Sequence, residues 1–313
     1  MTEYLVTGGA GFIGSHLVEY LLSQGKTVSV LDNLSTGKMK NLEPFQGRIA
    51  FYEGDICDES LLDKALAGVR IVFHEAALSS VPRSVKDPMA SHRSNSEGTL
   101  KLLMHAKEKG VKRVVYAGSS SAYGDSEELP KVETMLPKPL SPYASSKLAA
   151  EHYCQVFSTI YGLETVTLRY FNVFGPRQDA QSEYSAVIPK FVSALQENKN
   201  PIIFGDGGQT RDFNYITNVV SANMLAAEAP GVSGKVFNIA GGKRISLNEL
   251  LAFIQDIMHT NIKPHYDEPR IGDIRHSLAD ISMARELLRY ESCIDIFDGL
   301  KKTISWFLEK NAV

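Results

Sequence analysis

Residues 7–14 read TGGAGFIG, between an apolar run at Tyr4–Thr7 and an amphipathic pattern at Phe12–Ser23. The glycines of this stretch form a GxxGxxG pattern at Gly8, Gly11 and Gly14. Between a strand and a helix, the first glycine allows a tight turn, the second lets a pyrophosphate approach the backbone, and the third permits close helix–strand packing. The helix N-terminus then offers free N–H groups to phosphates. The stretch predicts a dinucleotide site rather than an ordinary structural turn, and with it a doubly wound α/β fold.

Asp32 closes the second apolar run and bears on which dinucleotide is bound. A carboxylate at this place accepts hydrogen bonds from the adenosine ribose and repels a 2′-phosphate, so NAD is expected rather than NADP. Asp55 and Ile56 are candidates for the adenine edge, with an acidic surface turn as the alternative. Ala76 and Ala77 follow the fourth apolar run and would let the cofactor lie close to the backbone.

The rest of the first half alternates strand and helix patterns. Apolar runs that indicate buried parallel strands lie at 4–7, 27–31, 49–52, 69–74, 111–117 and 165–170, and helical patterns lie at 12–23, 60–67, 96–109 and 143–160. Repeated βα units predict a Rossmann doubly wound parallel sheet with helices on both faces. We expect 1–175 to form the NAD-binding domain, with segments at about 212–240 returning to it. Residues 176–313 are expected to form mainly a smaller α/β substrate-binding domain.

The composition excludes several other classes of protein. Hydrophobic residues make up 43% and charged residues 22% of the chain, as in ordinary globular proteins. A net charge of −3 without a Lys/Arg-rich run argues against a nucleic-acid partner. No apolar stretch approaches the roughly 18 residues of a membrane span, and Met1 leads straight into a strand, so a cytoplasmic location is expected. The scattered cysteines (Cys57, Cys154, Cys293) and eight histidines show no ligand spacing, so we expect neither disulfides nor metal.

Tyr143-Ala-Ser-Ser-Lys147 is a candidate proton-transfer site. Residues four apart are neighbours on a helix face, so the Lys147 ammonium would lie beside the Tyr143 phenol. A nearby positive charge favours the phenolate, and such a tyrosine could take a proton from a substrate hydroxyl and return one. Chance can supply this spacing, so its weight depends on the residues around it.

Motifs along nearly the whole chain resemble those of the extended short-chain dehydrogenase/reductases. Within that superfamily the chain is similar to UDP-sugar 4-epimerases, above all those that act on UDP-N-acetylglucosamine. The stretches that carry the resemblance are TGGAGFIG (7–14), LDNLSTG (31–37), HEAALSSVPRS (74–84), YAGSSSAYG (116–124), SPYASSK (141–147), LRYFNVFGPRQ (168–178), GDGGQTRDF (205–213) and RIGDIRHSLADIS (270–282).

The resemblance implies roles for individual residues. Tyr143 resembles the catalytic base, Lys147 the residue that holds the nicotinamide ribose and lowers the pKa of the tyrosine, and Ser119 the residue that hydrogen-bonds the sugar O4. The cofactor site would comprise Gly8, Gly11, Phe12, Ile13, Gly14, Asp32, Asn33, Asp55, Ile56, Ala76, Ala77, Asn95, Tyr143, Lys147 and Tyr170. The substrate site would comprise Ser79, Ser119, Ser120, Ser121, Asn172, Gln178, Ala186, Val187, Ile202, Phe204, Arg211, Arg270, Asp273 and Ser277. Arg211 and Arg270 would clamp the pyrophosphate, for which forked guanidiniums are well suited. Asp273 would bind the uridine ribose.

The stretch after the fifth apolar run favours one reaction among relatives that share the Tyr/Lys pair. Sugar-nucleotide 4,6-dehydratases carry Thr-Asp-Glu before the Tyr-Gly, and UDP-glucuronate decarboxylases carry Thr-Ser-Glu. This chain has serines at 119–121, so the acidic residues that assist elimination are missing. The expected outcome is reversible oxidation at C4 through a transient 4-keto sugar, and therefore epimerisation.

The size of the side chain at Ser277 indicates whether the site accepts an N-acetylated sugar. Epimerases restricted to non-acetylated sugars tend to carry a bulky aromatic there, so the serine leaves room for a C2 N-acetyl group. UDP-GlcNAc/UDP-GalNAc interconversion is expected, with UDP-Glc/UDP-Gal as further candidates. Ser79, where N-acetylated relatives often have glycine, puts a strict preference in doubt. The alternatives are a UDP-glucuronate 4-epimerase, for which Arg177 or Arg83 would face the C6 carboxylate, and a non-catalytic NAD-binding protein.

The helical patterns at 96–109 and 143–160 resemble the pair that forms a four-helix dimer interface in this superfamily. Their apolar faces could equally belong to the core. A homodimer is therefore an expectation from resemblance, with the UDP-sugar as the expected small-molecule partner.

Overall fold

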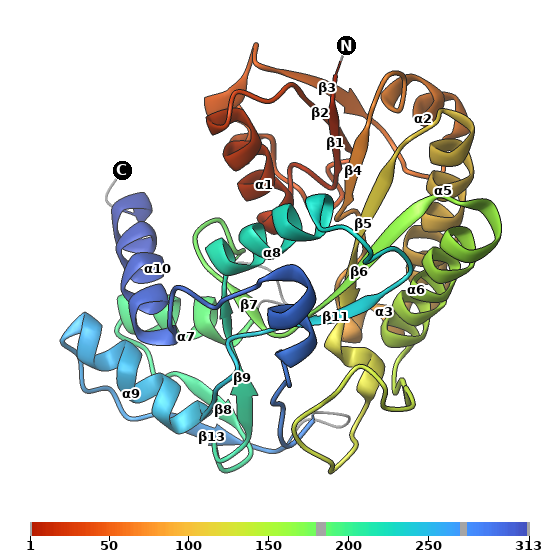
Figure 1. Cartoon of the computed structure of the whole chain (residues 1–313). Coiled ribbons are helices and arrows are strands. Elements are labelled where there is room, and N and C mark those ends of the chain that lie inside the picture. Colours follow the sequence, from red (N-terminus) through yellow and green to blue (C-terminus); the bar gives the residue numbers. More distant parts are fainter. Residues whose placement is uncertain (1, 180–185, 270–273, 312–313) are drawn as a thin grey trace.

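A parallel sheet of seven strands, in the order β11-β6-β5-β4-β1-β2-β3, runs through the protein (Figure 1). The computed structural model describes residues 2–179, 186–269 and 274–311. The strands of this sheet are β1 Tyr4–Thr7, β2 Val28–Asp32, β3 Ile49–Glu53, β4 Ile71–His74, β5 Arg113–Ser119, β6 Glu164–Tyr170 and β11 Val236–Ile239. Six of them coincide within a few residues with the apolar runs that predict strands. β11, from the second half of the sequence, pairs in parallel with β6 at the sheet edge.

Helices cover both faces of the sheet, which confirms the Rossmann doubly wound class. One face carries α1 (Phe12–Ser23) and α8 (Ile216–Glu228), and the other carries α2 (Glu59–Ala65), α5 (Gly98–Glu108) and α6 (Pro142–Tyr161) (Figure 1). A separate apolar core fills each face. Because both faces are covered, the strands are nearly continuous apolar runs rather than alternating ones.

The order of the strands reverses between β1 and β4, which lie side by side although β2 and β3 separate them in sequence. Loops after neighbouring strands then leave in opposite directions and open a crevice at the carboxyl ends of the strands, where ligands bind in such sheets. Short elements border this crevice: α3 (Val81–Lys86), α4 (Pro88–His92), the π-helical turn η3 (Arg93–Glu97) and the 3₁₀ turn η4 (Ser120–Tyr123). Two further 3₁₀ turns follow β2, η1 (Met39–Asn41) and η2 (Glu43–Phe45).

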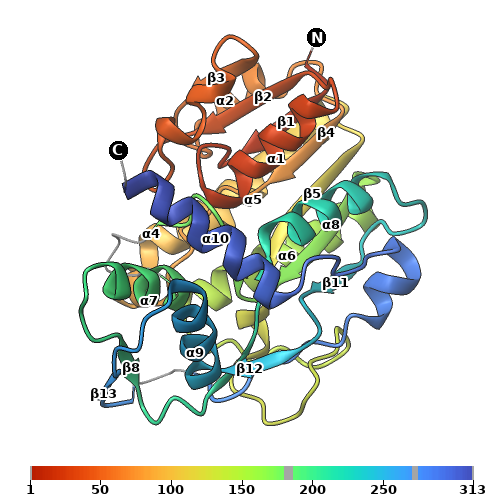
Figure 2. The same cartoon turned by 90° about the vertical axis from the view of Figure 1, so that its left-hand side faces the viewer.

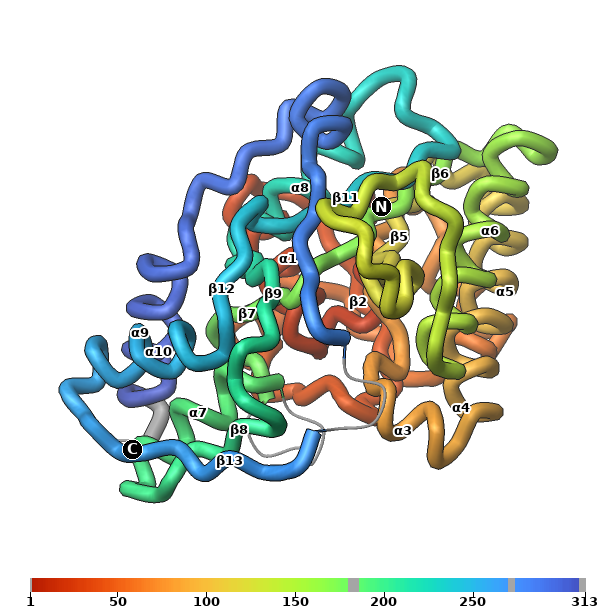
Figure 3. Tube along the Cα trace, turned by 90° about the horizontal axis from the view of Figure 1, so that it is seen from below, coloured from red at the N-terminus to blue at the C-terminus, as the bar shows by residue number. Residues whose placement is uncertain are grey.

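Apart from α8 and β11, the chain after β6 forms a second group of elements next to the sheet (Figures 2 and 3). It contains α7 (Val187–Gln196), α9 (Leu247–Met258), α10 (Ile296–Asn311) and the π-helical turn η5 (Ala284–Leu288). Three two-stranded pairs complete it: β7 (Val173–Phe174) with β10 (Asn214–Tyr215), β8 (Ile202–Phe204) with β13 (His265–Asp267), and β9 (Thr210–Asp212) with β12 (Arg244–Ser246).

Candidate active site

The glycine loop has the geometry of a phosphate cradle. Gly8 has φ +69°, and a Cβ atom there would stand 2.7 Å from the Ala76 nitrogen. A Cβ on Gly14 would stand 2.3 Å from the Gly8 oxygen, so this position allows the helix to pack closely against the loop. Gly11 is the N-cap of α1 and provides no side-chain hydrogen bond to the first N–H groups of the helix. Those donors are therefore available to an anion.

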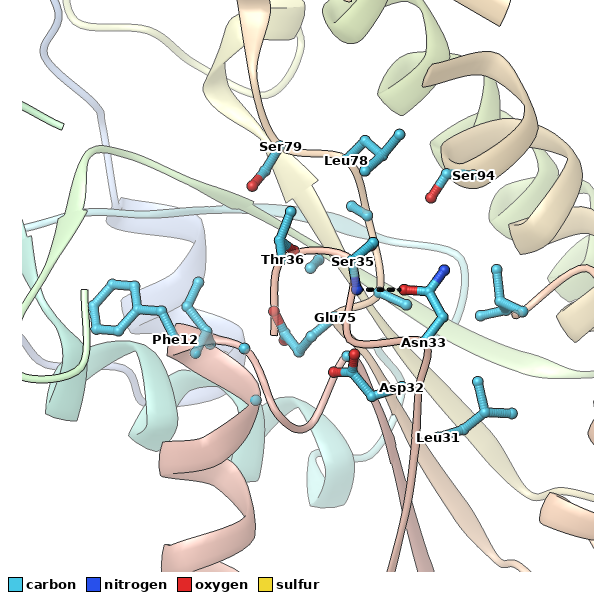
Figure 4. Close-up of a pocket in the computed structure, with 18 of the residues that line it drawn as sticks. Phe12, Leu31, Asp32, Asn33, Ser35, Thr36, Glu75, Leu78, Ser79 and Ser94 are labelled. Carbon is cyan, nitrogen blue, oxygen red and sulfur yellow. Dashed lines mark hydrogen bonds between the residues drawn. The ribbon is translucent and has the colours of Figure 1, made fainter. Parts of the chain in front are cut away.

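A cavity of about 410 Å³ adjoins this loop (Figure 4). Its lining includes most of the residues predicted for the cofactor and one predicted for the substrate: Gly8, Gly11, Phe12, Ile13, Gly14, Asp32, Asn33, Asp55, Ile56, Ala76, Ala77, Ser79, Tyr143, Lys147 and Tyr170. Asn95 instead lies behind the wall. Its side chain accepts a hydrogen bond from Leu78 N at 2.8 Å and donates one to Ser146 Oγ at 3.0 Å, so it supports the wall and the helix that carries Tyr143.

The carboxylate of Asp32 connects the glycine loop to the loop after β2 (Figure 4). It accepts hydrogen bonds from Ala10 N at 2.9 Å and Leu34 N at 2.8 Å. Burial raises the pKa of Asp32, while these two donors oppose the rise. Each carboxylate oxygen can accept a second hydrogen bond, so ribose hydroxyls can still be bound. The residues present thus fit a dinucleotide with an unphosphorylated adenosine ribose.

Helix α6 and strand β5 bring Tyr143, Lys147 and Ser119 together. Tyr143 is in the first turn of α6, and Lys147 follows one turn later. Ser119 ends β5, and its hydroxyl lies beside the Tyr143 phenol and forms a hydrogen bond with Ser121 Oγ at 2.8 Å. The Lys147 side chain is buried, with Nζ 4.7 Å from the centre of the Tyr116 ring. Tyr143 and Lys147 therefore line the cavity, and Ser119 lies beside Tyr143 just outside that lining.

The electrostatics of this wall differ from the sequence expectation. Burial raises the pKa of Tyr143, and the nearby Ser119 hydroxyl opposes that rise without reversing it. The expectation that Lys147 leaves the tyrosine with a lowered pKa is therefore wrong for this structure. The free energy needed to desolvate the phenolate is larger than the stabilisation that its neighbours provide. Burial also lowers the pKa of Lys147 to about 8, although Glu75 opposes this shift.

A second cavity, of about 260 Å³, lies among the short strands and helix α7 that follow β6 in the chain. Predicted substrate residues line it: Asn172, Gln178, Ala186, Val187, Ile202, Phe204 and Arg211. Two of its amide side chains, Gln178 and Gln209, carry a buried Oε1 atom that has no hydrogen-bond partner within the described residues. A buried acceptor without a donor costs free energy, so these atoms favour a ligand that brings donors.

The remaining predicted residues fall in three groups. Ser120 and Ser121 lie in η4, directly after Ser119. Ser277 follows the short bridge between Thr210 and His276, and its N–H donates to Thr210 O at 3.0 Å. Arg270 and Asp273 lie outside the described residues.

Sequence reasoning missed some residues that the fold brings to these cavities. Glu75 lines the first cavity, and Lys190, Gln209 and Leu247 line the second. Glu75 directly precedes Ala76, which was assigned to the cofactor site, and a carboxylate at the end of an apolar run is a signal that could have identified it. The others are on elements whose orientation depends on distant packing.

A family model described as the NAD dependent epimerase/dehydratase family matches residues 4–240. The chain belongs to this family. NAD is the family's cofactor, as the glycine loop and Asp32 predict. No α-helix within the described ranges is both long and apolar enough to span a bilayer. Within the same ranges there is no group of three or more His, Cys, Asp or Glu residues that could hold a metal ion.

Solved structures of sugar-nucleotide epimerases match this epimerase/dehydratase along almost its whole length. The UDP-N-acetylglucosamine 4-epimerase from Methanobrevibacter ruminantium M1, in complex with UDP-N-acetylmuramic acid, is 42% identical with a TM-score of 0.94, covering 99% of this chain and 100% of that chain. The UDP-glucose 4-epimerase from Thermotoga maritima, with UDP-glucose, is 38% identical with a TM-score of 0.95, again covering 99% and 100%. The UDP-glucuronic acid 4-epimerase from Bacillus cereus, in complex with UDP-glucuronic acid and NAD, is 32% identical with a TM-score of 0.92 and the same coverage. These matches confirm the resemblance to the UDP-sugar 4-epimerases.

Proposed function

We propose that this protein is an NAD-dependent 4-epimerase that interconverts UDP-GlcNAc and UDP-GalNAc and also accepts UDP-Glc and UDP-Gal. The observation that carries the proposal is the end of β5, where Ser119 lies beside Tyr143 and hydrogen-bonds Ser121, and the sequence has no acidic residue between Ser119 and Tyr123. Hydroxyls can position a sugar and relay a proton, but they do not supply the acid and base that elimination requires. The 42% identity to a UDP-N-acetylglucosamine 4-epimerase supports the same class.

In this proposal Tyr143 and Ser119 hold and activate the substrate hydroxyl. Tyr143 takes the proton of the sugar O4 and returns one to the same oxygen after the sugar has turned its other face to the cofactor, while Ser119 holds O4 within reach. When bound, NAD accepts and returns the two electrons and the hydrogen of C4, which is chemistry the protein cannot perform itself. Lys147 donates hydrogen bonds to the cofactor ribose and offers positive charge to the developing phenolate. Positioning of these groups supplies a large part of the rate enhancement.

The second cavity would bind the nucleotide. Arg211 lines it and, with Arg270 and Asp273, is proposed to hold the pyrophosphate and the uridine ribose. Gln178 and Gln209 offer acceptors that a ligand's donors would satisfy. Strong binding of the nucleotide and weak binding of the sugar would let the 4-keto sugar rotate between the two half-reactions. In this division, 1–175 with the return at about 212–240 binds NAD, and 176–313 binds mainly the UDP-sugar.

Coupled assays on UDP-Glc, UDP-GlcNAc and UDP-GlcA with one preparation test the substrate. We expect turnover of the acetylated sugar at a rate similar to, or above, that of UDP-Glc. Much faster turnover of UDP-Glc than of UDP-GlcNAc would contradict the proposal. Ser277→Tyr should remove the acetylated activity selectively, because a phenol ring would fill the space assigned to the N-acetyl group.

A UDP-glucuronate 4-epimerase is the second candidate, supported by the match to the Bacillus cereus enzyme. It would need a cation for the C6 carboxylate. Arg177, one of the two sequence candidates, pairs with Glu19 at 2.5 Å and lies over the Phe45 ring, which leaves exposed Arg83 as the other. The same assay panel separates the two, because only this candidate turns over UDP-GlcA.

We also propose a homodimer formed by α5 and α6. Large apolar side chains on these helices are exposed in the single chain, namely Met104, Tyr153, Val156, Ile160 and Tyr161. Exposed apolar surface of this kind on adjacent helices favours association. Light scattering should give twice the 34.5 kDa chain mass, and Val156→Glu should give the mass of one chain.

A further inference from the structure

Glu75 is a carboxylate on the wall of the first cavity to which the proposed chemistry assigns no task. It follows β4 directly, and its N–H donates to Thr7 O at 3.1 Å. The next residue, Ala76, stands so close to Gly8 that a Cβ atom there would be 2.7 Å from the Ala76 nitrogen. The backbone at Glu75 is therefore held against the glycine loop, and its carboxylate enters the cavity from a fixed point (Figure 4).

Two residues from other elements bind this carboxylate or its partner. The Tyr170 hydroxyl, at the end of β6, lies 2.8 Å from Glu75 Oε1. The Asn223 amide on α8 donates from Nδ2 to the Tyr170 hydroxyl at 2.8 Å and to Val219 O at 2.8 Å. Because Asn223 fills an acceptor position of the phenol, the single phenolic proton is directed to Glu75. The network thus orients the tyrosine as a donor to an ionised carboxylate.

The network also has a second consistent arrangement. Asn223 Oδ1 lies 3.1 Å from the Tyr170 hydroxyl, which could donate to that oxygen instead. A protonated Glu75 would then donate to the remaining lone pair of the phenol. Glu75 can therefore gain or lose a proton without leaving a buried polar atom unpaired, which is what a carboxyl that titrates in place requires.

Lys147 is the buried cation that lines this cavity, whose other cationic lining residue, Arg93, is exposed. Its side chain is buried among groups from three elements: Glu75 after β4, Tyr116 on β5, and Tyr143 and Cys154 on its own helix. His74 lies beside it on β4, where hydrogen bonds with Thr7 and Thr99 occupy both ring nitrogens. Glu151, one turn beyond Lys147, is paired with Arg169 at 2.6 Å. Of the two carboxylates near Lys147, Glu151 is thus already paired, whereas Glu75 forms no ion pair within the described residues.

We propose that Glu75 is a positioning residue that acts through Lys147: its carboxylate keeps the buried ammonium charged and so sets the upper pH limit at which Tyr143 works. The inference rests on the proposed function for its catalytic part alone. Opposite charges in a buried setting stabilise each other strongly, and removal of one shifts the titration of the other by roughly 1–3 pH units.

The directions of the shifts agree with this role. Burial lowers the pKa of Lys147 to about 8, and Glu75 opposes that shift. Burial raises the pKa of Glu75 to about 7, while Tyr170 and Lys147 oppose it. Burial raises the pKa of Tyr116, Tyr143 and Cys154 and lowers that of His74 to about 3, so these neighbours keep their charge state around neutral pH. Glu75 and Lys147 are then the two groups of this wall that titrate between about pH 6 and 9.

Direct titration of Lys147 tests the first half of the proposal without any turnover. NAD-saturated protein carrying [6-13C]lysine is followed by NMR from pH 6 to 10, with the Lys147 signal assigned from Lys147→Met. In Glu75→Gln, which keeps the shape and an acceptor for Tyr170, the midpoint of Lys147 should fall by about one pH unit or more. Tyr170→Phe, which weakens the ionised state of Glu75, should lower the midpoint by less. The exposed strand-end change Glu53→Gln is the control and should leave it in place. An unchanged midpoint in both Glu75→Gln and Tyr170→Phe overturns the proposal.

The pH profile of turnover tests the second half. For Glu75→Gln the alkaline limb of kcat should move to lower pH by the same amount as the NMR midpoint. A uniform loss of kcat at every pH, with the limb in its original place, indicates a structural role and overturns the inference. If the wild-type protein turns over no UDP-sugar, the proposed function fails, and the NMR titration still decides whether Glu75 governs Lys147.

Discussion

The Tyr143 hydroxyl is a weaker acid in this structure than in a free tyrosine, for reasons that are local to the residue. Burial raises its pKa, and the Ser119 hydroxyl is the group that opposes this. The spacing of Tyr143 and Lys147 predicts neighbours on one helix face, but spacing carries no information about how deeply either group is buried. Burial depends on two further parts of the sheet, namely β5, which contributes Tyr116 and Ser119, and the residue after β4, Glu75. The pair could be predicted from sequence, and its protonation behaviour could not.

Replacement of Tyr143 by Phe removes the proton-transfer group and leaves the ring in place. Loss of a general acid–base group typically lowers the rate by roughly 10²–10⁴-fold, so kcat should fall by that factor. Bound NAD and the affinity for UDP should stay near wild-type values, because neither depends on the phenolic hydrogen. The measurement is the coupled epimerase assay together with the NAD content of the purified protein. A variant that keeps more than about a tenth of wild-type kcat would remove Tyr143 from the mechanism.

At the scale of elements, the start of α6 determines where Tyr143 lies. Pro142 occupies the first helical position, where its missing N–H and fixed φ suit a helix start. Ser141 is the N-cap, and its hydroxyl accepts a hydrogen bond from Ala144 N at 3.1 Å. Tyr143 therefore sits in the first turn, between a capped start and the buried Lys147 one turn further. The sequence Ser-Pro-Tyr sets this geometry by itself, which is why the helix start could be predicted to within a residue.

Ser141→Ala should therefore affect both stability and rate. Loss of an N-cap hydroxyl typically costs about 1 kcal/mol of stability, and fraying of the first turn would loosen Tyr143. We expect kcat to fall several-fold more than the stability loss alone explains. Asp58→Ala is the matched control, since Asp58 caps α2 through Leu61 N at 3.2 Å, away from Tyr143. Urea unfolding should show a similar loss for both variants. If kcat falls equally in both, the cap of α6 has no special role.

Element boundaries also show where prediction from sequence ends. The apolar runs and glycine turns predicted the strands from β1 to β6 to within two residues at each end, because buried parallel strands are nearly continuous apolar runs. The helix expected from 96 instead begins as the π-helical turn η3, which the pattern does not distinguish from α-helix. The short strands β7 to β10 and β12 to β13 were not predicted from the sequence, because strands of two or three residues are too short to show a periodic pattern.

At the scale of the whole molecule, contacts between distant segments join the cofactor helix to the chain that leads into the second cavity. His16 Nε2 on α1 lies 3.0 Å from Pro176 O, 160 residues away in sequence. Arg177 pairs with Glu19 on the same helix, and Lys38 pairs with Asp179 at 3.0 Å. These contacts fix the position of Gln178, which lines the second cavity, relative to the glycine loop. No local pattern predicts them, because they depend on how the two halves of the chain pack.

His16 makes the stability of this junction, the contacts between α1 and residues 176–179, sensitive to acid. Burial, with the nearby Arg177 guanidinium, lowers the pKa of His16 to about 4, so the folded protein prefers the neutral imidazole. In the unfolded chain histidine titrates near 6.5, and stability from this group is therefore present above pH ~6.5 and lost as the pH falls toward 4. The full loss is on the order of 3 kcal/mol. Buried Glu75 and Asp212, whose pKa values burial raises to about 7, act in the opposite direction in the same window.

The variant His16→Gln isolates the contribution of His16 to the pH dependence of stability, because Glu75 and Asp212 remain in both proteins. The glutamine amide can still donate to Pro176 O but cannot take up a proton. We expect His16→Gln to be less stable than wild type at pH 7, where it loses packing against the Phe12 ring. As the pH falls from 6.5 to 4.5, the difference should shrink by about 2 kcal/mol or reverse, since only the wild type must then keep an imidazole neutral. Urea unfolding at the two pH values measures this, with exposed His152→Gln as the control for removal of a histidine. A constant difference between His16→Gln and wild type across this range would show that the junction does not respond to the charge of His16.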